Sequence, residues 1–242
     1  MKLIAIFLTG VCASFSWSAQ AQDTEAPLNK LSFKLTPTYF SSADGNNAFD
    51  VNLRAATGEH TLWVGHYRDH EGFEQSRAGY DLGKDFGFIR PVFSVQKASH
   101  GFWGGSVTAE VGDKTFAIVG WGRTNLRDYY NLNFDPNDAI TLGLGTRALD
   151  KTELSLVHIW DDRLRTRQRV THLVSRYRPQ EGQRWTVDAS YKTGTTSSGA
   201  YVRGLGLSVG FDYGAYFARL ARDPYANFSD SSQNRISVGM RF

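Results

Sequence analysis

The sequence predicts an all-β chain whose strands close into an antiparallel barrel that spans a membrane. Three observations lead to this prediction. Apolar and polar residues alternate in runs of about ten residues, the length that a tilted strand needs to cross a bilayer. The connections between these runs are alternately short and longer. The last run breaks off in mid-pattern on an aromatic residue, Phe242.

The first residues are predicted to be a secretory signal peptide rather than part of the barrel. Lys2 supplies a positive charge, the stretch LIAIFLTGV supplies a short apolar core, and Ala19-Gln20-Ala21 forms a cleavage site of the A-x-A type. The apolar stretch is too short to span a bilayer as a helix. We therefore expect residues 1–21 to be removed and residues 22–242 to form a single barrel domain without cysteine, since Cys12 lies in the signal peptide.

Fourteen segments carry the alternation. In RWTVDASYK, for example, Trp185, Val187 and Tyr191 lie on one side of the strand, and Asp188 and Lys192 lie on the other. The predicted strands cover residues 31–40, 48–57, 60–69, 74–83, 88–97, 102–111, 114–123, 138–148, 151–160, 169–178, 184–193, 200–213, 215–222 and 235–242. The weakest are 74–83 and 215–222, and the loss of one hairpin would leave twelve strands.

The apolar sides could face lipid around a barrel or the core of a soluble β-sandwich, and alternation alone does not separate these alternatives. The polar sides mix Gly, Ser and Thr with single charges of both signs, and aromatic residues end the apolar sides. A polar lumen and two aromatic girdles are typical of a transmembrane barrel. We therefore predict 12–14 strands, with fourteen as the best count, short periplasmic turns and longer extracellular loops.

The final segment, RISVGMRF, places Ile236, Val238, Met240 and Phe242 on one side. It resembles the C-terminal signal of Gram-negative outer-membrane barrel proteins. That resemblance implies a location in the outer membrane and recognition by the barrel-assembly machinery. In length and arginine content the chain is also similar to small solute-specific porins, such as those for acidic oligosaccharides. Because a sheet edge in lipid would leave backbone groups unpaired, the last strand is expected to pair with the first, LSFKLTPTYF.

The polar side of each strand predicts which charges line the lumen. One interpretation is a track that attracts anionic solutes, and the other is a set of ion pairs that fills a closed barrel. The predicted solute-lining residues are Asp50, Arg54, Arg77, Arg90, Glu110, Arg147, Asp188, Lys192 and Arg241, with Asp81, Glu153, Asp212 and Arg235 beside them.

Two predicted loops carry unusual patterns. In DDRLRTRQR, an arginine recurs at every second residue, which would place Arg163, Arg165, Arg167 and Arg169 on one side of an extended external loop. That arrangement could bind the phosphates of lipopolysaccharide or an acidic solute, or it could be a solvated loop neutralised by nearby aspartates. The aromatic residues of YYNLNFDPND could constrict the mouth, stack on sugar rings or belong to the girdle.

The histidines test for catalysis. A hairpin centred near Arg165 would place His158 and His172 opposite each other on the lipid side, where two ligands make a poor metal site. Acidic residues near His66 and His70 do not reproduce the spacing of outer-membrane proteases. Ser99 and His100 are adjacent, so their side chains should point to opposite faces of a strand. None of these patterns predicts an active site, and no metal is expected.

The formal net charge of +3 indicates no particular partner, and the chain has no phosphate-binding loop, zinc-ligand spacing or nucleotide fingerprint. We therefore expect no cofactor and no nucleic acid. The predicted function is a passive porin-like channel for small polar or anionic solutes, in contact with the bilayer and with lipopolysaccharide. The alternatives are an outer-membrane enzyme acting on lipid A or surface peptides, a non-conducting structural barrel, and a secreted sandwich that binds carbohydrate.

Overall fold

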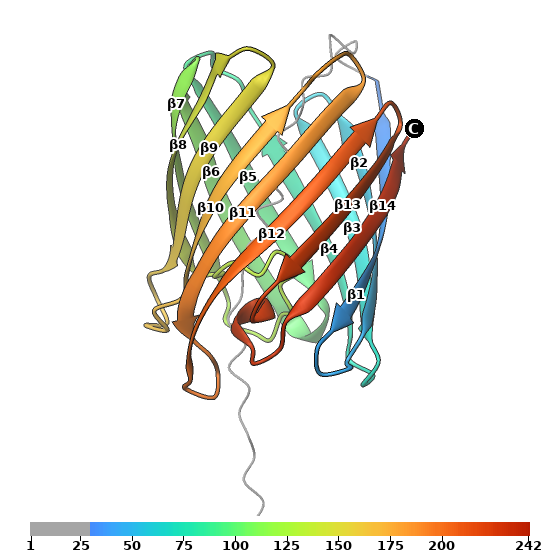
Figure 1. Cartoon of the computed structure of the whole chain (residues 1–242), viewed down its shortest axis with the longest axis vertical. Coiled ribbons are helices and arrows are strands. Elements are labelled where there is room, and N and C mark those ends of the chain that lie inside the picture. Colours follow the sequence, from blue (N-terminus) through green and yellow to red (C-terminus); the bar gives the residue numbers. More distant parts are fainter. Residues whose placement is uncertain (1–29) are drawn as a thin grey trace, which may run out of the picture.

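The computed structural model describes residues 30–242, so the predicted signal peptide lies outside the described residues and its removal stays a prediction. The described chain is a single closed antiparallel barrel (Figure 1). Each strand pairs with its neighbours in the sequence, and β1 pairs with β14. The prediction of a fourteen-stranded closed barrel is confirmed.

The strand boundaries are close to those predicted. The strands are β1 (Ser32–Ser42), β2 (Ala48–Thr57), β3 (His60–Asp69), β4 (Glu74–Gly83), β5 (Ile89–Ala98), β6 (Phe102–Gly112), β7 (Thr115–Thr124), β8 (Ala139–Leu149), β9 (Thr152–Asp161), β10 (Arg169–Tyr177), β11 (Gln183–Thr195), β12 (Tyr201–Tyr213), β13 (Tyr216–Asp223) and β14 (Gln233–Arg241). Every predicted segment forms a strand, including the two weakest. Two short 3₁₀ turns, η1 (Ser99–Gly101) and η2 (Ala226–Phe228), lie between strands. No helix within residues 30–242 has the length and apolar character needed to cross a membrane.

The seam between β1 and β14 closes the sheet. Leu35 lies opposite Met240, and Tyr39 lies opposite Ile236. At the end of the seam, Phe33 and Phe242 exchange two backbone hydrogen bonds of 2.8 and 3.0 Å. Their rings stack with centroids 5.5 Å apart. The seam therefore satisfies the edge groups of both terminal strands, which an apolar solvent could not do.

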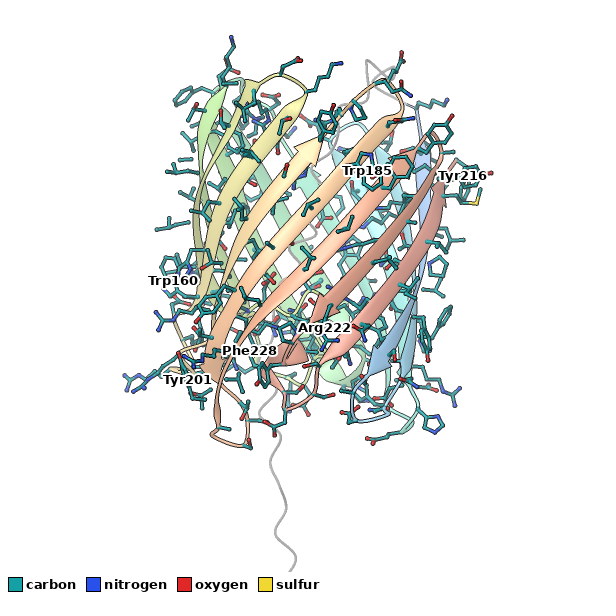
Figure 2. The ribbon with its side chains drawn as sticks, in the orientation of Figure 1. Trp160, Trp185, Tyr201, Tyr216, Arg222 and Phe228 are labelled. Carbon is teal, nitrogen blue, oxygen red and sulfur yellow. The ribbon has the colours of Figure 1, made fainter. Side chains whose placement is uncertain are left out.

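The outer face of the barrel is apolar and the inner face is polar. Leu144, Leu205 and Leu220 are 65%, 77% and 59% exposed, although they are large hydrophobic side chains. Trp160 and Tyr201 lie near one end of the outer face, and Trp185 and Tyr216 lie near the other (Figure 2). An apolar belt that runs around the whole barrel, with aromatic residues near both edges, fits lipid rather than water. This arrangement excludes the soluble sandwich.

The two ends of the barrel differ in their connections. We call them the turn end and the loop end. At the turn end, strands are joined by residues 58–59, 84–88, 113–114, 150–151, 178–182 and 214–215. At the loop end they are joined by residues 43–47, 70–73, 99–101, 125–138, 162–168, 196–200 and 224–232. The C-terminus lies at the turn end, which is uppermost in Figure 1.

Glycines of the inner face make room for aromatic rings of the neighbouring strand, and a guanidinium lies over each ring. The three sets are Gly79 with Trp63 and Arg54, Gly145 with Phe116 and Arg147, and Gly239 with Phe217 and Arg241. A Cβ at any of these glycines would come within 2.2–2.3 Å of the ring. Glycine is therefore required there for packing and not for its backbone conformation.

We expect Gly239→Ala to lower the stability of the barrel by about 1–3 kcal/mol, because overpacking forces side chains or backbone to move. The new Cβ would lie 2.2 Å from Phe217 and 2.3 Å from the carbonyl oxygen of Leu35, which cannot rotate away. The measurement is the temperature at which the folded band disappears on a gel.

The matched control is Gly210→Ala, also on the inner face, where the nearest atom would lie 3.7 Å from the new Cβ. Equal melting temperatures for the two variants would contradict this account of Gly239.

Candidate functional site in the barrel lumen

The lumen is the candidate functional site because it gathers most of the charged side chains of the strands. The charges predicted for the polar side lie on the inner face, opposite the exposed hydrophobic residues. Most of them form ion pairs across neighbouring or nearby strands. Their contact with a solute stays a prediction.

Partly exposed charges line the turn-end half of the lumen. Arg147 bridges Glu110 and Glu153 at 2.6 and 2.8 Å, and Arg176 lies 2.6 Å from Glu153. The side chains of Arg90, Glu110 and Arg147 are 26%, 25% and 35% exposed, so water reaches this half. Among residues 30–242 the inner face of this half carries Lys34, Arg54, Arg90, Arg147, Arg176, Arg184 and Arg241 against Asp81, Glu110, Glu153 and Asp212. Seven cations against four anions leave an excess of three positive charges.

Residues 125–138, which we call the inner loop, fold into the loop-end half of the lumen. Tyr129, Asn131, Phe134 and Asp138 are all at most 2% exposed. The ring of Tyr129 stacks on Phe102 with centroids 4.3 Å apart. Figure 1 shows this segment between the walls of the barrel. The girdle alternative for YYNLNFDPND is therefore wrong, and the aromatic residues fold into the barrel as a constriction requires, while stacking on sugar rings stays a prediction.

Gln75 and Gln233 hold the inner loop at Tyr130. The Gln75 side chain donates to the carbonyl of Tyr130 at 3.0 Å and accepts from its N–H at 2.7 Å. Gln233 donates to the Tyr130 hydroxyl at 3.0 Å. Burial raises the pKa of the Tyr130 phenol to about 12, so this group remains neutral at physiological pH.

The inner loop reaches the opposite wall. It leaves β7 and returns to β8, yet Arg235 of β14 donates to the carbonyl of Leu132 at 2.8 Å and lies over the ring of Phe134. On another side, Asp135 lies 3.0 Å from His172 of β10. The inner loop therefore crosses the lumen and is fixed at both sides.

His172 lies in the lumen, which corrects the prediction of a lipid-side position opposite His158. Its two ring nitrogens lie 3.0 Å from carboxylate oxygens of Asp135 and Asp188. Because ionised carboxylates only accept, this geometry fits a ring that donates from both nitrogens. The prediction failed by one residue of register: His172 pairs with Val157, and His158 pairs with Thr171, so the two histidines face opposite sides.

Lys192 and the Asp50–Arg77 pair are buried rather than exposed to an open lumen. Lys192 donates to the carbonyls of Pro224 and Tyr225 at 3.4 and 3.2 Å. It also lies near the ring of Phe134 in the inner loop and the ring of Phe228 in the loop of residues 224–232. Arg77 and Asp50 are 2.7 Å apart, each with a 6% exposed side chain. These residues hold the structure together instead of lining a water-filled path.

The predicted external arginine loop is exposed. Arg163, Arg165, Arg167 and Arg169 are all exposed, and the residues between them are less so. The backbone is not a regular extended strand, because Arg165 and Arg167 have φ values of 56° and 57°. Arg163 donates to Asp138 at 2.8 Å and to the carbonyl of Thr124 at 3.0 Å, and Arg169 already belongs to strand β10. Binding of an external anion by these four residues stays a prediction.

Arg219 is a lumen residue that sequence reasoning missed. It lies on the inner face of β13 between Gly210 and Ser237, whose small side chains leave it exposed. Its Nε donates to Ser208 at 2.7 Å, and no carboxylate forms an ion pair with it within residues 30–242. Its alternation with Phe217 and Ala221 could have identified it, but the mixed pattern of YFARLARD obscured the inner side. The predicted set of lumen residues also lacked three inner-face cations of other strands, Lys34, Arg176 and Arg184.

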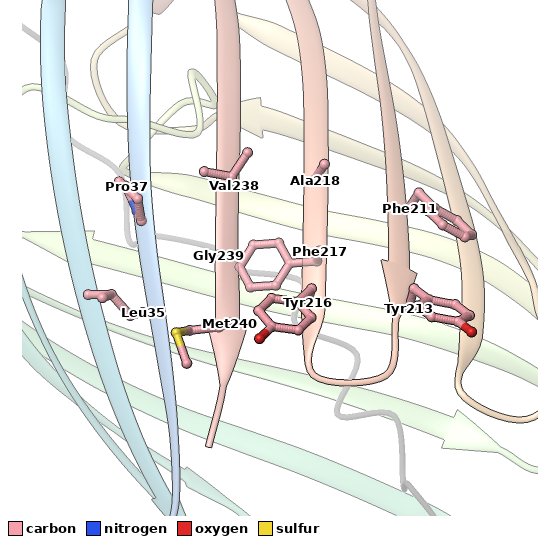
Figure 3. A pocket seen from close by; sticks show the side chains of 10 residues that line it. All are labelled: Leu35, Pro37, Phe211, Tyr213, Tyr216, Phe217, Ala218, Val238, Gly239 and Met240. Atoms are coloured by element: carbon pink, nitrogen blue, oxygen red, sulfur yellow. The ribbon is translucent and has the colours of Figure 1, made fainter.

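An open apolar groove of about 500 Å³ lies beside Ala218 on the outer face of the barrel (Figure 3). It is lined by Leu35, Pro37, Phe211, Tyr213, Tyr216, Phe217, Ala218, Val238, Gly239 and Met240. Because these side chains are almost entirely apolar, the groove belongs to the lipid-facing surface and is separate from the lumen. Within residues 30–242, no group of three or more His, Cys, Asp and Glu side chains is placed to hold a metal ion.

Comparisons with known proteins agree on the fold. The chain is similar to the outer membrane protein Omp33 of Acinetobacter baumannii, with a TM-score of 0.57, 10% identity, and coverage of 89% of this chain and 99% of that one. It has the fold of an outer-membrane β-barrel protein. A KdgM porin in complex with oligogalacturonate gives a TM-score of 0.49 at 8% identity, covering 86% of this chain and 99% of that one. No protein-family model and no curated protein sequence matches the chain.

We expect Gln75→Ala to loosen the inner loop of the barrel. The substitution removes both hydrogen bonds to the backbone of Tyr130, and an unsatisfied buried backbone group costs about 1–3 kcal/mol. Hydrogen–deuterium exchange should become faster in residues 125–138 and stay unchanged in the strands. The matched control is Ser76→Ala on the outer face of the same strand. Unchanged exchange in the inner loop of Gln75→Ala would show that Gln75 does not hold it.

Proposed function

We propose that the protein is a passive outer-membrane channel for small polar or anionic solutes. The observation that supports this most strongly is the inner loop, which narrows a polar lumen while the turn-end half stays accessible to water. A purely structural barrel could fill its interior with apolar side chains or ion pairs alone. A fixed loop across a wet, charged lumen instead fits a pore that selects by size and charge.

The excess of positive charge in the turn-end half supports a preference for anions. Arg219 adds a cation without a carboxylate partner in the described lumen. Fixed charges in a low-dielectric barrel concentrate counter-ions near them. The preference should be moderate, because most other lumen cations are paired with carboxylates.

The geometry favours a channel over an outer-membrane hydrolase. His66 and Ser76 are hydrogen bonded on the outer face, with Nδ1 and Oγ 3.0 Å apart. In a catalytic triad, the other ring nitrogen faces the nucleophile and Nδ1 faces an orienting carboxylate. No carboxylate hydrogen-bonds to His66 among the described contacts. Ser99 accepts from the N–H of Ser76, and the ring of His100 stacks on Phe73, so these two residues do not form a pair.

The proposed location is the outer membrane of a Gram-negative bacterium, with the turn end toward the periplasm. The apolar belt, the two aromatic girdles and the unequal ends support this placement. Recognition of the final strand by the barrel-assembly machinery belongs to the same proposal, based on Ile236, Val238, Met240 and Phe242.

In planar bilayers, we expect the purified barrel to give discrete conductance steps with a weak anion preference. Arg219→Glu should shift the reversal potential in the direction of cation selectivity, because fixed lumen charge sets selectivity. The anion-to-cation permeability ratio should fall by roughly twofold or more. The control is Arg222→Glu, with the same charge change on the outer face of the same strand. Absence of conductance in wild-type protein would reject the channel, and equal shifts in both variants would reject a lumen role for Arg219.

A further inference from the structure

Charged residues on the outer face are confined to the loop end. On the lipid-facing sides of the fourteen described strands, the charged residues are Arg68, Glu74, Lys97, Arg123, Arg169, Arg203 and Arg222. Each lies within three residues of the end of its strand at the loop end. The turn-end edge of the same face carries none. Six cations and one anion therefore form a basic collar around one mouth, a strong asymmetry in a chain whose net charge is only +3.

Two of the collar cations already have acidic partners. Arg68 lies 3.3 Å from Glu74, and Arg123 pairs with Asp162 while lying over the ring of Trp121. The other four contact no carboxylate among the described residues. Arg169 donates to Thr193 at 3.1 Å, and Arg222 donates to Asn234 at 3.2 Å, both neutral groups. These four cations are available to an external anion.

Three of the available cations lie on one arc of the wall, formed by β10 to β13. Arg169 and Arg203 both lie opposite Thr193 of the strand between them, so their Cα atoms are about 10 Å apart, two strand spacings. Arg222 follows on β13, near the end that carries Trp160 and Tyr201 (Figure 2). By contrast, the outer faces of β1, β2 and β14 carry no charge.

Exposed apolar side chains lie between this arc and the middle of the barrel. On β10, Leu173 follows Arg169 on the same face after Thr171; Leu205 follows Arg203 on β12, and Leu220 precedes Arg222 on β13. They are 54%, 77% and 59% exposed. A ligand for this arc must therefore present several anionic groups at the edge of the bilayer and apolar chains within it.

We propose that Arg169, Arg203 and Arg222 form a binding site for the phosphate groups of lipopolysaccharide in the outer leaflet. A guanidinium group can donate two parallel hydrogen bonds to the oxygens of one phosphate. A headgroup with two or more phosphates can therefore bind separate arginines about 10 Å apart. The acyl chains of the same molecule would cover Leu173, Leu205 and Leu220. The site also assigns the loop end to the outer leaflet. This inference rests on the proposed outer-membrane location and not on conduction.

The test uses the whole barrel, purified in a neutral detergent and titrated with diphosphorylated lipid A, with bound lipid counted by native mass spectrometry. We expect the triple variant Arg169→Gln/Arg203→Gln/Arg222→Gln to bind lipid A at least about tenfold more weakly than wild type, since three charge-assisted contacts are lost. The affinity of wild type for fully dephosphorylated lipid A should be lower than its affinity for the diphosphorylated form by a similar factor. Added salt should weaken the wild-type complex.

The matched control is the triple variant Lys114→Gln/Lys151→Gln/Arg178→Gln, which removes the same charge from the turn end. It should bind lipid A as wild type does. Equal losses in both triple variants would show attraction by net charge alone and would overturn the site. Full binding by the loop-end variant, or equal binding of dephosphorylated lipid A, would also overturn it. The melting temperature in lipid-free detergent shows that each variant is folded, and a barrel that binds lipid A without conducting would reject only the channel.

Discussion

The structure depends on one constraint: within hydrocarbon, no backbone N–H or C=O group can remain unpaired. The seam between β1 and β14 meets this constraint by removing both sheet edges. Closure then fixes the two faces of every strand, since a side chain can only point to lipid or to the lumen. The exposed belt of leucines and aromatic rings, and the concentration of charge inside, both follow from closing the sheet.

Charges gathered inside a barrel need partners, and the chain meets this need mainly with arginine. It contains 19 Arg and 8 Lys. The planar guanidinium can serve two carboxylates at once, as Arg147 does between Glu110 and Glu153, whereas a lysine ammonium acts as a point charge. The same group lies over the ring of Phe116, 4.0 Å from its centroid, while making these contacts. Arginine thus combines pairing and packing on a wall where glycine has already made room for the ring.

The strands could be predicted from sequence because the bilayer imposes a period of two and a fixed length on each of them. What could not be predicted depends on contacts between distant segments. Whether His172 faces lipid or the lumen depends on the pairing register of β9 and β10 across residues 162–168. A shift of one residue in that register exchanges the two faces. The ion pair between Arg163 and Asp138 joins two different loops, which alternation within a strand does not predict. The path of the inner loop depends on Gln75, Gln233 and Arg235, which alternation identifies only as inward-facing polar residues.

The inner loop separates the polar lumen side chains that hold loops from those that can face a solute. A loop inside a barrel must have its own backbone groups satisfied, so the loop-end half commits Gln75, Arg235 and His172 to holding it. Lys192 is committed in the same way beneath residues 224–232. Charges bound to loops do not contact a passing solute directly, although their field still acts across the lumen. Direct contact between the proposed channel and an ion therefore falls mainly to the open turn-end half, with its cationic excess, and to Arg219.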